Sequence, residues 1–217
     1  MKIVALSDIH RNYEKAKDIL RKEQECDLIV ICGDITTHGH REEAKKALED
    51  FIQNGKPILA ISGNMDSKEI DGVIEEMGCS INGKGVIIEE VGFWGVPAGP
   101  LSLLHTPYEL SEEEIYKIAE KGWKDVERAR IKVMVSHAPP YNTKLDKIFL
   151  GKHVGSESIR KFVLTHSPDV LICGHIHEAR GKDVLGKTQM VNCGPAAHGY
   201  YAKVEISGTI KIENCGR

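Results

Sequence analysis

Five short segments of the chain are apolar at nearly every position, and each is followed by polar residues. They span residues 3–6, 28–32, 58–61, 131–135 and 170–173. Runs of Ile, Leu and Val without polar alternation are typical of strands buried on both faces of a parallel sheet. In such sheets the functional groups lie beyond the carboxyl ends of the strands. We therefore expect the polar residues that follow these five strands to lie along one edge.

Amphipathic segments alternate with the strands. Residues 12–25, 40–51 and 67–77 carry apolar side chains at helical spacing and charged side chains between them. Ser67 is the expected N-cap of the third helix. Ser111 and Glu114 have the spacing of a capping box for a later helix. Strands that alternate with helices indicate an α/β fold.

Other segments predict antiparallel strands. Glycine-punctuated apolar stretches predict a hairpin and, near the C-terminus, a group of strands with a turn at Gly208. These stretches are residues 85–89, 91–96, 188–191, 199–206 and 208–213. The sheets are therefore expected to be mixed.

The polar residues after the five apolar strands form an ordered set. They are Asp8 and His10, Asp34, Asn64 and Asp66, His137, and His175 and His177. Within Asp8-x-His10 and His175-x-His177, two extended residues would point their side chains to the same side. Each pair is therefore expected to reach toward a common site.

This order of motifs (DxH, GD, GNxD, a single His, GHxH) resembles that of the calcineurin-like metallophosphoesterases, in particular a small prokaryotic group related to cyclic-nucleotide phosphodiesterases. The resemblance covers the chain from Asp8 to His177. It implies a four-layer αββα sandwich with two mixed β-sheets, the metallophosphatase-like fold, with residues 1–217 as a single domain.

The resemblance also implies two divalent metal ions per chain. Asp8, His10 and His177 would hold one ion, Asn64, His137 and His175 would hold the other, and the Asp34 carboxylate would bridge both. Two such ions clamp the phosphate oxygens of an ester and generate the attacking hydroxide. The mixed donors favour Mn, Fe, Zn, Co or Ni over Mg or Ca. The implied activity is hydrolysis of a phosphodiester or phosphomonoester, with the diester favoured and with Asp34 and Asn64 at the reacting centre.

One residue departs from the pattern of the family. The usual third motif places a His after Gly-Asn, where it can protonate the leaving group, and this chain has Met65 there. Methionine cannot donate a proton. His38, four residues after Asp34 on a loop expected to pass the metals, is the first candidate for a substitute acid.

Further candidate residues for substrate binding lie on loops expected to border the site. They are His38, His105 in residues 97–107, and His153 and Ser156 in a Gly-rich segment before a helix that runs to about His166. A helix start with Lys and His before it is a candidate phosphate seat. A plain N-cap at Ser156 explains the same residues equally well. Residues 139–144, with two prolines, are expected to form another lip of the pocket.

The net charge of the chain and two alternative functions bear on which partners it binds. Lys and Arg total 29 against 32 Asp and Glu, a net charge of -3, so there is no sequence-wide basic footprint for nucleic acid. A nuclease would need a local basic groove, and nucleic acid stays open on that condition. The alternative from another class is a scaffold that keeps the fold and the metals with weak or absent catalysis, which Met65 favours and the complete ligand set opposes. The expected partner is a small phosphate-ester substrate, and a homo-oligomer is compatible with the sequence.

The N-terminus and the cysteines bear on location. The segment MKIVALSD runs directly into the first motif and has neither a signal peptide nor a membrane helix. The six cysteines form no CxxC pair, and two lie inside apolar strands, which is typical of free buried cysteines. We expect a cytoplasmic protein without a membrane partner.

Overall fold

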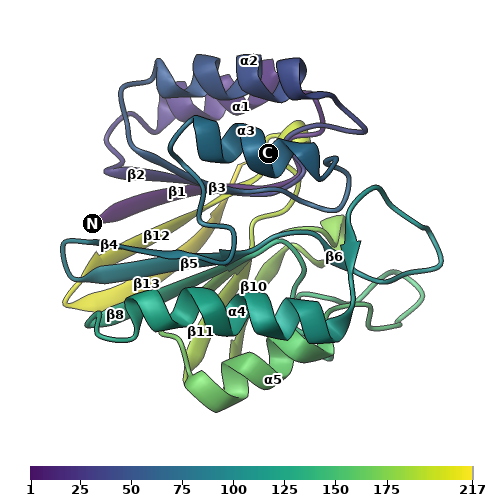
Figure 1. The fold of residues 1–217 in the computed structure, drawn as a ribbon. Helices are drawn as coiled ribbons and strands as arrows, with labels where there is room; N and C mark the ends of the chain where they lie inside the picture. Colours follow the sequence, from purple (N-terminus) through teal and green to yellow (C-terminus); the bar gives the residue numbers. More distant parts are fainter. Residues whose placement is uncertain (217) are drawn as a thin grey trace.

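The computed structural model describes residues 1–216 and places two mixed β-sheets face to face (Figure 1). The first sheet has the strand order β13-β12-β1-β2-β3. Its strands are β1 (Lys2–Leu6), β2 (Leu28–Cys32), β3 (Ile58–Ile61), β12 (Tyr201–Ser207) and β13 (Thr209–Cys215).

The second sheet has the order β10-β11-β9-β8-β5-β4. Its strands are β4 (Gly85–Ile88), β5 (Val91–Val96), β8 (Ile131–Ser136), β9 (Val170–Cys173), β10 (Gly181–Leu185) and β11 (Thr188–Asn192). A short separate pair joins β6 (Gly99–Pro100) to β7 (Glu109–Leu110).

The strands that precede the polar motifs are parallel within each sheet. β1, β2 and β3 pair in parallel in the first sheet, and β5, β8, β9 and β11 do so in the second. Antiparallel strands flank them: β12 and β13 in the first sheet, and β4 and β10 at the two edges of the second. The carboxyl ends of β1, β2, β3, β8 and β9 are therefore free to deliver side chains to one rim.

Helices cover the outer face of each sheet (Figure 1). Over the first sheet lie α1 (Tyr13–Lys22), α2 (Arg41–Ile52) and α3 (Glu69–Glu76). Over the second lie α4 (Glu112–Val126) and α5 (Glu157–His166). Two short 3-10 helices, η1 (His177–Ala179) and η2 (Ala196–His198), follow β9 and β11. The four-layer sandwich with two mixed sheets is confirmed.

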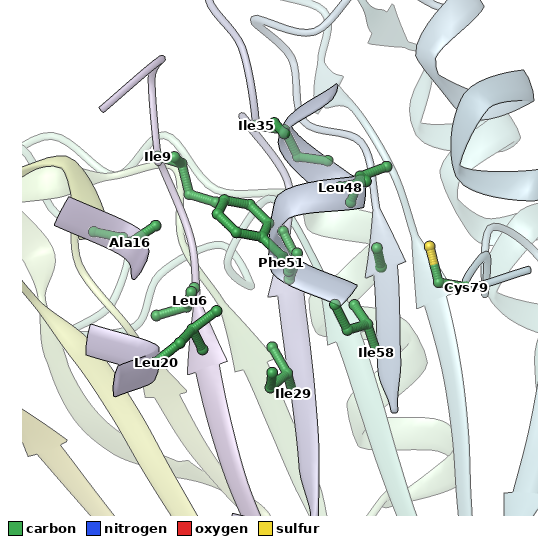
Figure 2. Packing of buried hydrophobic residues seen from close by; sticks show 14 of the residues in the cluster. Leu6, Ile9, Ala16, Leu20, Ile29, Ile35, Leu48, Phe51, Ile58 and Cys79 are labelled. Atoms are coloured by element: carbon green, nitrogen blue, oxygen red, sulfur yellow. The ribbon is translucent and has the colours of Figure 1, made fainter. Parts of the chain in front are cut away.

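Three apolar clusters hold the layers together. One lies between the two sheets, and one lies under each helical layer. Figure 2 shows the cluster of the first layer, where helix residues such as Leu20 and Phe51 meet strand residues such as Leu6 and Ile29. All five residues of β2 are buried, because this strand has sheet neighbours on both sides and apolar layers above and below. Five of the six cysteines are buried, as the sequence predicted.

Some predicted details are wrong. Ser67 is not the cap of α3: the helix begins after Lys68, and the Ser67 hydroxyl donates to the Gly39 carbonyl and to Glu69. The strand at Thr188–Asn192 does not join the other C-terminal strands but pairs in parallel with β9 in the second sheet. Its antiparallel partner β10 was not predicted, since its Lys and Asp mask the alternation. Gly199 lies in a left-handed turn before β12, not in a strand.

Candidate metal centre

Polar side chains from both sheets meet at the rim formed by the parallel strand ends. Two groups of ligand atoms are compact enough to hold a cation: Asp8, His10 and His177, and Asp8, Asp34 and His137. Within each group the ligand atoms lie within 4.8 Å of one another. His10 Nε2 lies 3.3 Å from His177 Nε2, although 167 positions separate the two residues. The fold therefore brings the distant motifs to one place.

Asp34 lies between the two sides of this cluster. Its Oδ2 is 3.6 Å from His10 Nε2 and 3.4 Å from His137 Nε2. Its Oδ1 accepts a hydrogen bond from the Met65 backbone N–H at 2.7 Å, which fixes the orientation of the carboxylate. One oxygen of Asp34 thus points between histidines of the two sheets.

A hydrogen bond to a backbone carbonyl orients the ring of His137. Its Nδ1 lies 2.8 Å from the Cys32 carbonyl, which can only accept, so Nδ1 carries the proton. In the neutral ring the lone pair is then on Nε2, which points at Asn64 Oδ1 (2.8 Å) and Asp34. A hydrogen bond of this kind to the second ring nitrogen is the usual way in which a protein orients a metal-binding histidine.

His175 stands at the edge of the cluster. Its ring lies 5.0 Å from the His137 ring, centroid to centroid, and its backbone N–H donates to both carboxylate oxygens of Asp8. His175 and Asn64 belong to neither of the two compact groups. Both face the same open cavity, described below.

The backbone at the motifs is left-handed and not extended, contrary to the sequence prediction. The φ angles of Asp8, His10, Asp34 and His175 lie between +45° and +68°. Non-glycine residues rarely adopt this conformation, and such strain concentrates at functional sites. The paired side chains converge because sharp turns follow the strands, not because the residues alternate in extended chain.

Two glycines leave room for the carboxylates. A Cβ at Gly63 would collide with Asp34 and would lie 2.7 Å from His137 Cε1. A Cβ at Gly174 would collide with the Ser7 hydroxyl and lie 2.5 Å from Asp8 Oδ2. The Gly of each motif is therefore required by the close approach of the two sheets.

A buried carboxylate behind the cluster holds the loops in place. Asp66 accepts from the backbone N–H groups of Ile35, Thr36 and Gly63 and from the Thr36 hydroxyl. These bonds tie the loop after β2 to the loop after β3. The sequence pattern contained Asp66 but gave no indication of this supporting role.

Burial and neighbouring charges shift the pKa values of the carboxylates and histidines in the cluster. Burial alone would raise the pKa of Asp8. The hydrogen bond from His177 and the charge of His137 outweigh this effect, and the pKa lies well below its usual range. Burial lowers the pKa of His137, but the charges of Asp34 and Asp8 raise it to about 9. Burial and the charge of His137 lower the pKa of His175 to about 4. Protons therefore compete with any cation for these donors.

The donor set fits divalent cations. Asp8 is fully buried and Asp34 is 2 % exposed, and two carboxylates out of water require nearby positive charge. The ring nitrogens of His10, His137 and His177 lie close to carboxylate oxygens, and those of His10 and His177 lie close to each other. Imidazole with carboxylate is a common ligand combination for Mn, Fe, Zn, Co and Ni. The residues present thus suit the cations that the sequence implied.

A cavity of about 640 Å³ opens beside the cluster. Asn64 and His175 line it, together with loops around residues 99–106 and 148–155. Its size is typical of small-molecule sites.

The predicted substrate-binding residues do not all line this cavity. His153 lines it, and its Nδ1 is held 2.7 Å from the buried carboxylate of Asp146. His38 and His105 are exposed, and neither is among the residues that line the cavity. The loop that carries His38 does reach the cluster, since Thr37 Oγ1 lies 2.9 Å from His10 Nδ1.

A phosphate seat at Ser156 does not agree with the structure. Ser156 is the N-cap of α5 and is fully buried. The carboxylate of Glu112 already accepts from the Ser156 hydroxyl and from the N–H groups of Glu157 and Ser158. The anion at this helix start is therefore supplied by α4.

Sequence reasoning missed two organising residues near the cavity. Asp146 accepts from the backbone of Asn142, Thr143 and Gly155 as well as from His153. Glu112 joins the starts of α4 and α5, as described above. Glu112 bonds to Ser156, 44 positions away, and Asp146 bonds within a loop that has no periodic pattern, so helix and strand patterns did not identify them.

None of the helices within residues 1–216 is both long and apolar enough to cross a bilayer.

Comparisons with known proteins agree with the geometry of the rim. The sequence profile described as calcineurin-like phosphoesterase matches residues 1–179. An uncharacterised protein of Methanocaldococcus jannaschii is 36 % identical over 205 residues, which cover 93 % of this chain and 91 % of that protein.

Two solved structures share the fold at low sequence identity. The structure of TT1561 of Thermus thermophilus has a TM-score of 0.77 at 14 % identity and covers 99 % of this chain and 98 % of its own. A structure described as a novel archaeal phosphodiesterase has a TM-score of 0.57 at 15 % identity and covers all of both chains. At these identities the likeness concerns the fold alone.

Proposed function

The chain belongs to the calcineurin-like phosphoesterase family, and we propose that it hydrolyses small phosphodiesters at a centre of two divalent cations. The observation that carries the proposal is the position of Asp34 Oδ2, between His10 Nε2 and His137 Nε2. A single carboxylate oxygen in that place is suited to bridge two cations.

The residues divide into two sets around Asp34. Asp8, His10 and His177 would hold one cation, and Asn64, His137 and His175 would hold the other. When bound, the cations neutralise the phosphate oxygens and activate water as a nucleophile. The protein orients the donors: the Cys32 carbonyl fixes the His137 tautomer, and the Met65 N–H fixes Asp34.

The charge of the cavity favours diesters over monoesters. Glu109, Glu112 and Glu157 line the cavity, and within residues 1–216 it has no Lys or Arg in its wall. A monoester carries up to two negative charges and a diester only one. Beside carboxylates, the doubly charged ester is bound less well because like charges repel. The same lining opposes a nuclease, which needs cations along its groove.

A scaffold without catalysis is the second candidate, and Met65 favours it. The side chain is half-buried beside the cluster and offers no proton to a leaving group. The proposed function therefore requires either an activated leaving group or another acid.

Hydrolysis assays distinguish the two candidates. We expect Mn²⁺-loaded protein to hydrolyse bis-p-nitrophenyl phosphate with a higher kcat/KM than p-nitrophenyl phosphate, and EDTA to abolish both activities. A protein that binds its metals yet hydrolyses neither ester would be the scaffold. Faster hydrolysis of the monoester would overturn the preference for diesters only.

A further inference from the structure

Apolar side chains from two loops line the cavity beside the metal centre. Leu101, Leu103 and Leu104 come from one loop and form the leucine wall, and Ile148 and Val154 come from the other. Asn64 and His175, which belong to the proposed metal ligands, also line this cavity. A phosphate at the centre would therefore have room to extend its organic group into it.

The leucine wall is unusually exposed for such apolar side chains. Leu101 is 69 % exposed, Leu103 95 % and Leu104 82 %. Leucines exposed singly are common on protein surfaces, but a contiguous group next to a site indicates contact with an apolar ligand or partner.

Hydrogen bonds hold this wall in place. The Glu109 carboxylate accepts from the Ser102 backbone and hydroxyl and from the Thr106 backbone and hydroxyl. The Leu104 N–H donates to the Ser102 hydroxyl, and the Leu101 N–H donates to the Leu110 carbonyl. The loop thus presents its leucines in a fixed arrangement.

The loop that carries Ile148 and Val154 is anchored in the same manner. The Val154 N–H donates to the Asp146 carbonyl, and the Ile148 N–H donates to the Lys152 carbonyl. The Asp146 carboxylate in turn holds the Gly155 N–H and His153. The backbone of both loops is therefore held in place before any ligand binds, so binding need not order it.

Apart from its two histidines, the charged side chains of the cavity are acidic. Glu109, Glu112 and Glu157 line it, whereas the part of the chain that the structure describes contributes no Lys or Arg to its wall. A second phosphate or carboxylate on the ligand would find no Lys or Arg here. It would also be repelled by the three carboxylates.

We propose that this cavity binds an uncharged, apolar organic group of the substrate, so that the enzyme selects alkyl or aryl phosphate esters over esters that carry a second anionic group. The inference rests on the proposed function, because it assigns the phosphate itself to the centre around Asp34. The leucines of the 101–104 loop and Val154 supply the apolar contact, and the acidic lining supplies the discrimination.

Binding of phosphonates tests the proposal without requiring turnover. A phosphonate places its anionic group at the metals, and its single organic group must then occupy the cavity. Calorimetry on Mn²⁺-loaded protein would compare methylphosphonate, hexylphosphonate and hexane-1,6-diphosphonate. Burial of a methylene strengthens binding by about two- to fourfold, so hexylphosphonate is expected to bind about thirtyfold tighter than methylphosphonate, or more. The diphosphonate is expected to bind more weakly than hexylphosphonate.

Variants locate the effect on the leucine wall. The double variant Leu103→Ser and Leu104→Ser should bind hexylphosphonate several-fold more weakly and methylphosphonate with unchanged affinity. Leu164→Ser changes a leucine that is 51 % exposed on α5, away from the cavity lining, and should leave both affinities unchanged.

The outcomes separate this inference from the proposed function. Equal affinities for methyl- and hexylphosphonate, or tighter binding of the diphosphonate, in a protein that still hydrolyses esters would overturn the inference alone. A chain-length preference that survives in the double leucine variant would also overturn it. If no phosphonate binds and no ester is hydrolysed in the presence of Mn²⁺, the proposed function fails and the inference fails with it.

Discussion

Met65 occupies the position where the family usually carries a proton-donating histidine. The effect of this difference on catalysis can be measured with single variants. General-acid assistance is worth about 10² to 10⁴ in rate and matters most for poor leaving groups such as alkoxides. If His38 substitutes as the acid, His38→Ala should lower kcat by about that factor on an alkyl ester and far less on a p-nitrophenyl ester.

The reciprocal variant provides the control. If His38 does not serve, His38→Ala should be nearly silent, and Met65→His should raise turnover of the alkyl ester. With both metals bound, no effect of either variant on the alkyl ester would mean that acid catalysis does not limit the reaction.

Gly63 offers a second test at the scale of one residue. A Cβ there would collide with Asp34, so Gly63→Ala should displace this carboxylate and weaken Mn²⁺ binding by about 10- to 100-fold, the range found when supporting groups of metal ligands are changed. Gly181→Ala is the matched control, because its Cβ would meet only the Ala179 carbonyl at 3.8 Å. Mn²⁺ titration of both variants makes the comparison, and equal affinities would contradict the proposed role of Gly63.

The identity of the clustered residues could be predicted from the sequence, but their conformation could not. Because Asp8, Asp34, His137 and His177 each follow an apolar strand, the sequence was sufficient to predict that they lie at one rim. The left-handed φ angles of Asp8, His10, Asp34 and His175 were not predictable, because most Asp and His residues lie outside that region. The turns are set by close packing of the two sheets, which depends on residues far apart in the chain.

At the scale of elements, Glu109 controls the order of the loop that carries the leucine wall. Burial alone would raise the pKa of Glu109. The hydrogen bonds from Ser102 and Thr106 outweigh this effect and lower the pKa from the ordinary 4.5 to about 2. A folded-state pKa below the unfolded one means that the stabilisation is fully present above pH 4.5 and is lost as the pH falls toward 2.

Amide hydrogen exchange of residues 99–109 measures this effect. In the wild type, protection of the Ser102 and Thr106 amides should fall between pH 4.5 and pH 2. In Glu109→Gln, protection should be lower at pH 6 and nearly independent of pH over that range. Glu157→Gln changes another carboxylate of the cavity and should behave as the wild type does; a wild-type loop whose protection does not depend on pH would refute the role of Glu109.

Strands and helices of the two halves followed from their periodicity, whereas contacts between elements did not. The capping box of Ser111 and Glu114 and the N-cap at Ser156 were predicted and are present. The phosphate seat at Ser156 failed because Glu112, 44 positions earlier in the chain, fills the helix start. Local patterns identify where a helix begins, but they do not reveal which distant side chain lies there.

At the scale of the whole molecule, the sandwich explains why one rim can collect donors from five strands. Parallel strands of both sheets end at the same side, and the cluster of apolar side chains between the sheets fixes their relative position. The sequence resemblance implied this architecture, and the low-identity structural relatives share it. The apolar cavity could not be predicted, because its walls come from loops that have no periodic pattern.

If Asp34 joins two cations, the metal content of Asp34→Asn should differ from that of the wild type. After equilibration with Mn²⁺ and removal of free metal, elemental analysis should find two ions per chain in the wild type and in Asp18→Asn, an exposed control on α1. Asp34→Asn, which keeps the shape of the side chain but not its charge, should lose more than one ion per chain together with diester hydrolysis. Unchanged metal content and activity in Asp34→Asn would contradict the account.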